Sequence, residues 1–408
     1  MISGESIKAK YDLKELELNS LLEITQAIND NLPEESLYKI YDFTIRANLN
    51  IKKLALYVLD DQWECKVNFG TDVKFLKHAF DEQFLSYKKI RKIRKSDHSP
   101  FNEFQVILPI AHKDKKLAFV FISGGEGEKD KEMNTTFIQA LSNIIIVAIE
   151  NKKLVRKQIK QEMLRRELEI AGNVQKFLFP KNLPYSHEIK VAAFYQPHHS
   201  IGGDYYDFIK INDHQFLFCV ADVSGKGIPA ALLMSNFQAS LRTLSRRTIL
   251  LQDIITELNY LVMSNADGEH FITFFGAIYD KKHKRLKYVN SGHNPPILLR
   301  NKKDVQFLTD GSTILGAFNE LPFLNVGIIE NIDEFLFCGF TDGLTEITNS
   351  KDEEFGEEKI LEVVRSNIDQ EPTELIASII NSMEKFKGEN ELKDDITLFA
   401  CKVDFSNK

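Results

Sequence analysis

The 408-residue chain has few cysteines, no long apolar run and no strongly basic segment, and each absence excludes a class of protein. Its four cysteines, Cys65, Cys219, Cys338 and Cys401, lie far apart and form no Cys-x-x-Cys pair. Cys219 and Cys338 fall in apolar strand-like runs, so we expect buried free thiols in a reducing compartment. The net charge is -7 without a basic cluster, so we expect no nucleic-acid partner.

Long apolar segments are also missing. Residues 1–12 are polar and lack the apolar core of a signal peptide. The most apolar helical stretch, residues 137–149, is interrupted by polar side chains and is too short to span a bilayer. The sequence therefore predicts a cytoplasmic protein that does not enter a membrane. Because 408 residues exceed what one hydrophobic core usually supports, we expect at least two domains.

The first predicted domain covers about residues 11–149. A helical pattern ends at Asn31-Leu32-Pro33, where a second helix begins, and strand-like runs follow at residues 54–59, 63–69, 104–110 and 117–122. A long helix from about residue 131 closes the region. This α+β order resembles a GAF domain, a small ligand-binding or dimerising module of signalling proteins. The resemblance is compatible with a working small-molecule pocket or with a degenerate one.

A charged helical linker is predicted over residues 150–180. Apolar and small residues repeat every three or four positions, first at Ile144, Ala148, Asn151 and Val155, then at Leu164, Leu168, Ala171, Gln175 and Leu178. The register slips between Ile159 and Leu164, as in a coiled coil with a stutter, so we expect a homodimer through this linker and the GAF-like domain. The alternative is a solvated helix that packs on the next domain.

Aspartates recur at turns in the third region, residues 185–404. Two of these turns follow the same apolar tetrapeptide, Phe216-Leu217-Phe218-Cys219 and Phe335-Leu336-Phe337-Cys338, which is typical of buried strands. Carboxylates therefore stand repeatedly where a buried strand leaves the core. Hard divalent cations take oxygen ligands from such scattered turns, so the pattern indicates a carboxylate-built metal centre.

Five segments in this region, taken in order, resemble the motifs of the bacterial SpoIIE/RsbU-type phosphatases. These belong to the metal-dependent PPM class, also called protein phosphatase type 2C. The segments are Ile201-Gly202-Gly203-Asp204, Ala221-Asp222-Val223-Ser224-Gly225-Lys226-Gly227, Asn290-Ser291-Gly292-His293-Asn294, Phe340-Thr341-Asp342-Gly343 and Asp394-Asp395-Ile396-Thr397. The resemblance implies an α-β-β-α sandwich over residues 185–404.

The resemblance also assigns ligands for two Mn²⁺ or Mg²⁺ ions. Asp222 is implied as the bridging ligand, the Val223 carbonyl completes one ion's shell, and Asp204 acts on the same ion, partly through water. Asp342 and Asp394 are implied for the other ion. Two ions would neutralise phosphoryl oxygens and lower the pKa of a bound water far below that of bulk water. Asp395 is the alternative to Asp394, and Asp207 is either a supporting or a turn residue.

Other residues that suggest chemistry have simpler interpretations. His293 is better explained as part of a structural loop than as a catalytic base. Lys226 lies in a glycine-rich turn, but the spacing and the missing Ser or Thr do not fit a P-loop. Ser224 has no histidine near it in sequence, so we find no candidate covalent nucleophile. The arginine that grips phosphate in eukaryotic PPM enzymes has no obvious counterpart.

The function implied is a signalling phosphatase that hydrolyses phosphoserine or phosphothreonine on a protein. By family resemblance the substrate is often an anti-sigma-factor antagonist. Two other classes of function compete with this reading. One is a catalytically silent scaffold that kept the fold, which the intact Asp204, Asp222, Asp342 and Asp394 argue against. The other is a two-metal phosphodiesterase acting on nucleotides or nucleic acid, which the net negative charge disfavours.

Overall fold

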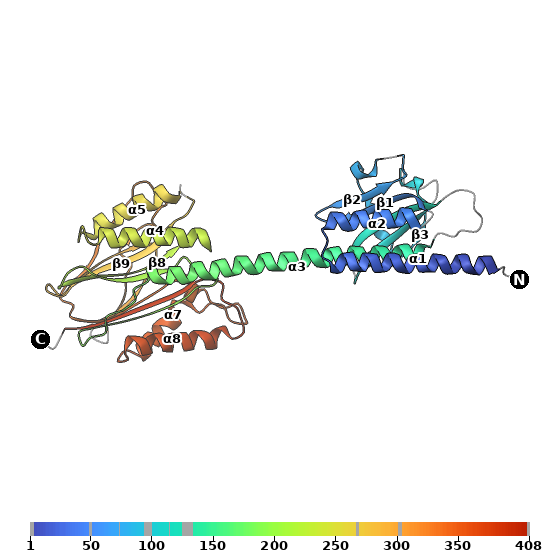
Figure 1. Cartoon of the computed structure of the whole chain (residues 1–408). Helices are drawn as coiled ribbons and strands as arrows, with labels where there is room; N and C mark the ends of the chain where they lie inside the picture. The colour runs from blue at the N-terminus through green and yellow to red at the C-terminus, as the bar shows by residue number, and fades with distance from the viewer. Residues whose placement is uncertain are drawn as a thin grey trace. The chain divides into compact units, whose positions relative to one another are not determined.

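The structure is a computed structural model that describes residues 4–48, 51–72, 74–93, 100–113, 115–124, 134–266, 269–300 and 304–405. Contacts between Cα atoms divide the chain into two compact units, Met1–Gln161 and Glu162–Lys408 (Figure 1). Each unit has its own hydrophobic core. None of the helices in the described ranges is both long and apolar enough to cross a membrane.

The N-terminal unit is built on a five-stranded antiparallel sheet with strand order β2-β1-β5-β4-β3. The strands are β1 (Ile51–Leu59), β2 (Trp63–Phe69), β3 (Arg91–Lys92), β4 (Val106–His112) and β5 (Lys115–Gly124). The helices are α1 (Gly4–Asn29), α2 (Glu34–Asn48), the first part of α3 (Thr135–Gln175), and the 3-10 turns η1 (Phe75–Lys77), η2 (Glu82–Ser86) and η3 (Phe101–Glu103). The predicted helices and strands of this region are therefore confirmed, with boundaries that differ by a few residues.

The two faces of this sheet are covered differently. The α helices pack on one face, where Leu56 and Val120 join a core with Tyr41 of α2 and Ile138 of α3. The other face carries an aromatic cluster made by the sheet and the 3-10 turns: Tyr57, Phe75, Phe84, Phe101, Phe104, Phe119 and Phe121. Neighbouring rings in this cluster lie mostly 5–6 Å apart. Side chains therefore fill the space between the sheet and its turns. The resemblance of this unit to a GAF domain stays a prediction.

The C-terminal unit contains two sheets. One has the order β13-β10-β9-β8-β7, with β14 also paired to β10, and the other has the order β12-β11-β15-β16-β6. The strands are β6 (Ile189–Gln196), β7 (Tyr205–Lys210), β8 (Gln215–Val223), β9 (Ile272–Asp280), β10 (Arg285–Ser291), β11 (Ile297–Arg300), β12 (Asp304–Phe307), β13 (Gly311–Ser312), β14 (Gly327–Ile329), β15 (Glu334–Phe340) and β16 (Ile396–Asp404). The helices are α4 (Ile228–Leu244), α5 (Leu251–Ala266), α6 (Asp342–Thr345), α7 (Gly356–Ser366) and α8 (Pro372–Lys387).

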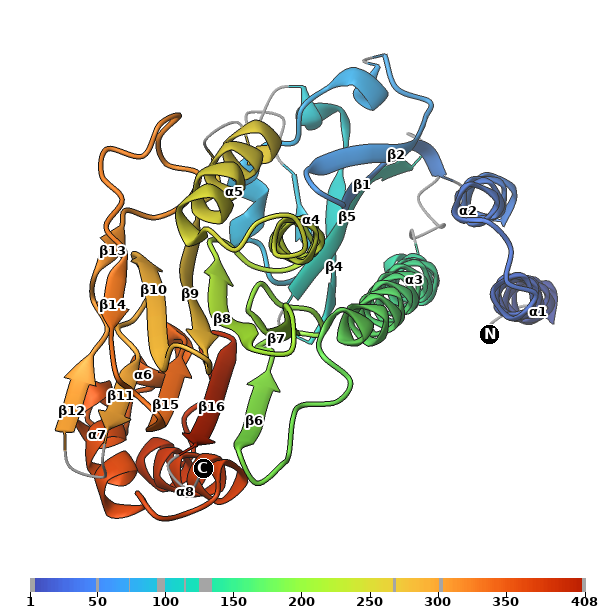
Figure 2. The same cartoon turned by 90° about the vertical axis from the view of Figure 1, so that its left-hand side faces the viewer.

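These elements form four layers, seen end-on in Figure 2. Helices α4 and α5 pack on the outer face of the first sheet, and α7 and α8 pack on the outer face of the second. The inner faces meet in a core that includes Phe218 and Phe337, whose rings lie 4.8 Å apart. Strands β8 and β15 are thus buried on both faces, which explains their continuous apolar runs and confirms that Cys219 and Cys338 are buried thiols. The mixed α+β class is confirmed.

Helix α4 begins at Ile228, with Pro229 in its first turn. Gly227 adopts a φ of +74°, and Leu233, Met234 and Phe237 are buried against the sheet. Helices α5 and α7 were not predicted from the sequence. Leu251, Ile254, Ile255, Leu258 and Val262 are the buried stripe of α5, and Ile360 and Val364 are that of α7. Their spacing of one, three or four residues is the helical signal that the sequence carried.

Helix α3 is one continuous helix of 41 residues, so the closing helix of the first region and the start of the linker are the same element. Its C-terminal end corrects the predicted coiled-coil stripe. The Gln175 side chain is buried and its Nε2 donates a hydrogen bond to the Gly202 carbonyl at 2.7 Å, while Leu178 packs into the core beneath α4. Gln175 and Leu178 therefore pack on the C-terminal unit of their own chain, as the alternative interpretation held.

Candidate metal centre

Four turns bring the predicted acidic ligands to one end of the sandwich. Asp222 is the penultimate residue of β8, and Asp204 directly precedes β7, whose first residue pairs with Ala221. Asp342 begins α6 just after β15, and Asp394 lies two residues before β16. Because β15 and β16 pair through Phe340 and Leu398, their acids meet at the same end of the second sheet. The acids therefore come from both sheets.

Burial and repulsion from neighbouring carboxylates raise the pKa values of three of these acids. Burial, followed by the charges of Asp342 and Asp394, raises the pKa of Asp222 to about 7. Burial and then Asp394 raise the pKa of Asp342, and burial and then Asp222 raise the pKa of Asp204 well above its ordinary value. These shifts mean that the acids lie close enough to repel each other in a partly dry setting. Such a cluster of oxygen donors is stabilised by positive charge, and hard divalent cations are the ions it suits.

Hydrogen bonds from residues at one end of the second sheet hold the Asp204 carboxylate in place. One of its oxygens, Oδ2, accepts hydrogen bonds from the hydroxyls of Thr341 at 2.9 Å and Thr397 at 2.6 Å. The Thr341 hydroxyl also accepts from the backbone N–H of Thr397, which fixes both threonines to each other. Asp204 is 1% exposed. The two threonines therefore fix the position of Asp204 and leave Oδ1 as its second acceptor oxygen.

Asp395 has a different role from Asp394. Its two oxygens accept hydrogen bonds from the backbone N–H groups of His198 and Gly203, each at 2.7 Å. The Asp395 carboxylate thus fastens the turn that leads to Asp204. A Cβ at Gly202 would lie 2.1 Å from Asp395 Oδ2, so only glycine fits there. These contacts favour Asp394 as the ligand and give Asp395 a structural role.

Two further close approaches explain residues beside the acids. A Cβ at Gly343 would lie 1.9 Å from the Asp395 carbonyl oxygen, so the residue after Asp342 must be glycine. A Cβ at Gly203 would lie 2.9 Å from the Val223 carbonyl oxygen, which brings that carbonyl against the turn of Asp204. The Val223 carbonyl therefore lies beside the turn that carries Asp204.

A lysine stands among these acids. Lys226 Nζ lies 2.7 Å from Asp394 Oδ2 and also donates to the Lys393 carbonyl. Among the residues that the structure describes, no three His, Cys, Asp or Glu side chains are grouped tightly enough to hold a metal as they stand. The donor chemistry fits Mn²⁺ or Mg²⁺, because the acids are oxygen ligands whose mutual repulsion a divalent ion would relieve. The residues that would hold the ions are Asp204, Asp222, Val223, Asp342 and Asp394.

His293 is a structural residue in its observed contacts. Its Nδ1 lies 2.9 Å from the Thr273 hydroxyl, and its backbone N–H donates to Asn290 Oδ1 at 2.8 Å. Burial lowers the pKa of His293 to about 3, so the ring is neutral at physiological pH. Thr273 pairs with Asp222 across β8 and β9, and His293 therefore braces the strand beside the acids.

Asp207 forms a buried ion pair that the sequence analysis missed. Arg242 of α4 donates to both Asp207 oxygens, from Nε at 2.7 Å and from a terminal nitrogen at 3.0 Å, and the Tyr205 hydroxyl also bonds to Asp207. The Asp207 side chain is fully buried. The pair ties α4 to β7, directly after the turn of Asp204. An arginine in the last turn of a helix gives no signal in the sequence that it reaches a strand.

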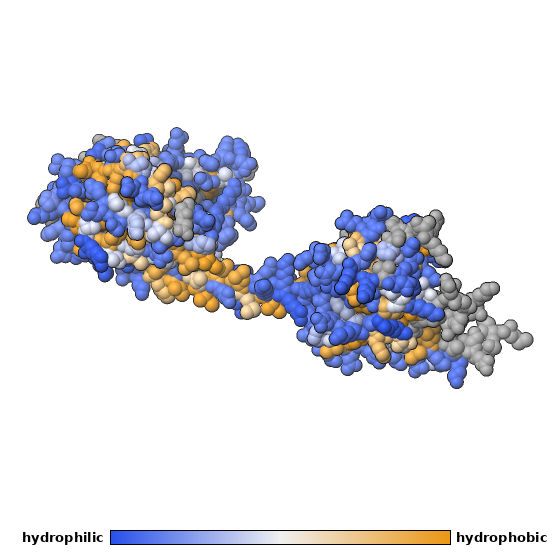
Figure 3. All heavy atoms as spheres, turned by 90° about the horizontal axis from the view of Figure 1, so that it is seen from above, coloured by the Kyte–Doolittle hydropathy of each residue, from blue (hydrophilic) through white to orange (hydrophobic). Residues whose placement is uncertain are grey.

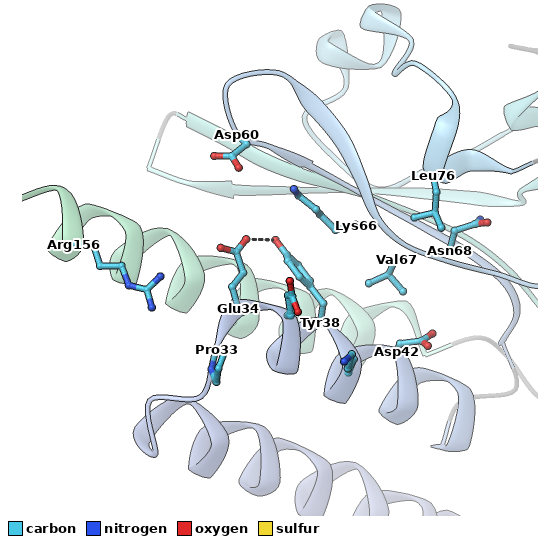
Figure 4. A pocket seen from close by; sticks show the side chains of 12 residues that line it. Pro33, Glu34, Tyr38, Asp42, Asp60, Lys66, Val67, Asn68, Leu76 and Arg156 are labelled. Carbon is cyan, nitrogen blue, oxygen red and sulfur yellow. Dashed lines mark hydrogen bonds between the residues drawn. The ribbon is translucent and has the colours of Figure 1, made fainter.

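The N-terminal unit carries an open cavity of about 750 Å³ between α2, β2 and α3 (Figure 4). Charges of both signs line it, and Val67 and Leu76 add apolar surface. The Tyr38 hydroxyl donates to Glu34 at 3.2 Å, and Lys153 of α3 lies 3.3 Å from both Glu34 and Asp60. The cavity therefore adjoins an ion-pair network that includes α3.

Comparisons with known proteins identify the C-terminal region. Residues 212–404 match the family described as Stage II sporulation protein E (SpoIIE). The chain is 29% identical over 249 residues to the phosphoserine phosphatase RsbU of Bacillus subtilis, covering 59% of this chain and 71% of the relative. It is 24% identical over 236 residues to the phosphoserine phosphatase RsbP of the same organism, covering 57% of this chain and 56% of the relative. It is 26% identical over 287 residues to protein IcfG of Synechocystis, covering 64% of this chain and 45% of the relative.

Among solved structures, the PP2C domain of SiaA from Pseudomonas aeruginosa shares the fold with a TM-score of 0.53. The sequence identity is 18%, and the match covers 60% of this chain and 99% of that one. The order of the five motifs, the four-layer sandwich and the family match agree on one assignment. The C-terminal region therefore contains a SpoIIE family domain, and it is similar to the SpoIIE/RsbU-type serine/threonine phosphatases of the PPM class.

Proposed function

We propose that the chain is a metal-dependent phosphoprotein phosphatase that removes phosphate from serine or threonine of a signalling protein. The observation that carries the proposal is the convergence of Asp204, Asp222, Asp342 and Asp394 from both sheets. Burial and the charges of neighbouring carboxylates raise the pKa values of Asp204, Asp222 and Asp342, which indicates that these acids repel one another. We propose residues 185–404 as the catalytic domain, residues 150–180 as the linker and residues 11–149 as a GAF-like sensor.

The chemistry follows from the substrate's charge. A phosphoserine dianion repels nucleophiles and would be repelled by this acidic cluster. When bound, Mn²⁺ or Mg²⁺ would neutralise the phosphoryl oxygens and activate a water for attack. In this proposal Asp222 would serve both ions, and Asp342 and Asp394 would hold the second one. Thr341 and Thr397 keep Asp204 oriented, and Asp395 fixes the backbone turn on which Asp204 stands.

The substrate class is proposed from the relatives. RsbU and RsbP are both named phosphoserine phosphatases. We therefore propose a phosphoserine or phosphothreonine protein as substrate, and an anti-sigma-factor antagonist as the specific kind. A phosphodiesterase would use the same donor set, but the net charge of -7 disfavours a nucleic-acid substrate. A silent scaffold would have no need to retain four convergent acids.

Metal removal tests the catalytic proposal. We expect the full chain to release phosphate from a phosphoserine protein in Mn²⁺ or Mg²⁺, to lose this activity in excess chelator, and to regain it when the metal is restored. The physical reason is that the acids alone repel the substrate. Phosphate release would be measured on a phosphoserine protein and, in parallel, hydrolysis of a nucleotide diester. Full activity in chelator contradicts the metal requirement, and diester cleavage without monoester cleavage favours the phosphodiesterase.

We also propose that the chain is a homodimer that pairs through α3. Apolar side chains on this helix are exposed at Val155, Ile159, Met163, Ile170 and Val174, each more than half exposed. Figure 3 shows apolar surface along this part of the molecule. These five exposed side chains are spaced by four or seven residues, so they lie along one side of the helix. Gln175 and Leu178, which pack internally, lie on another side. Leu164 is also exposed, but it lies about 100° around the helix from Met163, on the side of Gln175, and Leu168 is partly buried.

A polar substitution in α3 tests the dimer. Replacing Ile159 and Met163 with serine should convert a dimer into a monomer at micromolar concentration, because the pairing would lose its apolar contacts. Mass would be measured by light scattering, together with phosphatase activity. Lys157→Ser with Lys160→Ser is the matched control, since it changes the same helix outside the apolar side. A wild-type chain that is already monomeric, or a double variant that stays dimeric, contradicts the proposal.

A further inference from the structure

We propose that Lys226 competes with a divalent ion for Asp394 and so weakens metal binding by this phosphatase. The inference rests on the proposed metal centre and adds a regulator of its occupancy. Lys226 Nζ lies 2.7 Å from Asp394 Oδ2, which is the distance of a direct charge-assisted hydrogen bond. This contact does not fit a P-loop interpretation, because the Lys226 ammonium binds a carboxylate rather than a phosphate.

The ammonium is surrounded by acceptors. Besides the Asp394 carboxylate, it donates to the carbonyl of Lys393, the residue before it. The charge of Lys226 also opposes the rise in the pKa of Asp342 and of Glu346, which places both carboxyl groups within its electrostatic reach. A single lysine thus partly neutralises the side of the cluster made by Asp342 and Asp394.

The loop that carries Lys226 is held in place on both sides. Ser224 exchanges two hydrogen bonds with Phe271: its N–H donates to the Phe271 carbonyl, and its hydroxyl accepts from the Phe271 N–H, at 2.9 and 2.8 Å. Gly225 and Gly227 take φ values of +91° and +74°, conformations that favour glycine. The loop therefore connects Asp222 to α4 by a fixed path that delivers Lys226 to Asp394.

Competition follows from this arrangement. Asp394 Oδ2 cannot serve the ammonium and a divalent ion equally, because two cations on one oxygen repel each other. Part of the free energy of metal binding is therefore spent on breaking the Lys226–Asp394 pair. Lys226 is 48% exposed and Asp394 38% exposed, so solvent screens the pair and its effect is moderate. The expected role is to set the metal concentration at which the site fills.

Calorimetric titration of the full chain with Mn²⁺ tests this inference without measuring turnover. We expect Lys226→Met to bind Mn²⁺ roughly threefold to tenfold more tightly than the wild type, as suits a partly exposed pair. Lys226→Arg keeps the charge and should retain the wild-type affinity. Lys210→Met is the matched control. Lys210 pairs with Asp213 on the β7–β8 turn, so this substitution removes the same formal charge at a different place.

Thermal unfolding of each variant in the absence of metal would confirm that the variants are folded. Equal or weaker Mn²⁺ binding by folded Lys226→Met overturns the inference, and so does a gain of the same size in Lys210→Met or in Lys226→Arg. If the wild type and Lys226→Met both fail to bind Mn²⁺, the metal centre itself is wrong and the competition with it. If both bind with equal affinity, the metal centre stands and only the role of Lys226 falls.

Discussion

Asp222→Asn should reduce phosphatase turnover by roughly a thousandfold or more while leaving the protein folded. Asp222 has the most central position in the acidic cluster, since Asp342, Asp394 and Asp395 all act on its carboxyl group. Its proposed role as the bridging ligand makes both ions depend on it. The substitution keeps the shape of the side chain and opens no cavity, and it removes a charge that its neighbours repel. We therefore expect the free energy of unfolding in metal-free buffer to stay equal or to rise.

The measurement pairs initial rates on a phosphoserine protein with urea unfolding of the same preparations. Asp342→Asn should behave in the same way, because burial and Asp394 raise the pKa of Asp342 as well. Asp213→Asn serves as the control, since Asp213 is an exposed acid on the β7–β8 turn. Undiminished activity in either Asp222→Asn or Asp342→Asn would show that the binuclear reading is wrong. A loss of activity accompanied by unfolding would assign these acids a structural role.

The parts of the fold that could be predicted were those with local signals. Buried strands β8 and β15 appear as apolar runs, and α4 has glycine, proline and an apolar stripe in consecutive positions. The acids at the turns were also visible, because an aspartate that follows a buried strand is an unusual placement. What these residues share is that a few neighbours in sequence determine their structure.

The unpredicted contacts join residues that are distant in sequence. Asp204 is bound by Thr341 and Thr397, which lie 137 and 193 residues away, and Asp395 is bonded to Gly203, 192 residues away. No pattern within one segment reveals such a partner. The C-terminal end of the predicted α3 stripe was misassigned for a related reason. An apolar stripe shows that a helix face will be covered, but Gln175 and Leu178 show that the cover can be the helix's own domain rather than a second chain.

The Asp207–Arg242 pair is the best example of a contact hidden from the sequence, and its loss should destabilise the C-terminal unit. Arg242→Met would leave the Asp207 carboxylate fully buried, with Tyr205 and the backbone N–H of Phe208 as its remaining donors. Removing one partner of a buried ion pair typically lowers the free energy of unfolding by about 3–5 kcal/mol. Arg242 is itself 40% exposed, so we expect a smaller loss of about 2–3 kcal/mol.

Urea unfolding of the wild type, Arg242→Met and the double variant Asp207→Asn/Arg242→Met would measure this effect. The double variant should recover part of the loss, because it removes the buried charge as well as its partner. Arg246→Met is the matched control for losing an arginine, because Arg246 is exposed and lies two residues beyond the end of α4. The loss of phosphatase activity, expressed as a free energy, should be smaller than the loss in the free energy of unfolding, since neither Asp207 nor Arg242 is a proposed ligand. If the free energy of unfolding of Arg242→Met lies within about 0.5 kcal/mol of the wild-type value, the pair contributes specificity of packing rather than stability.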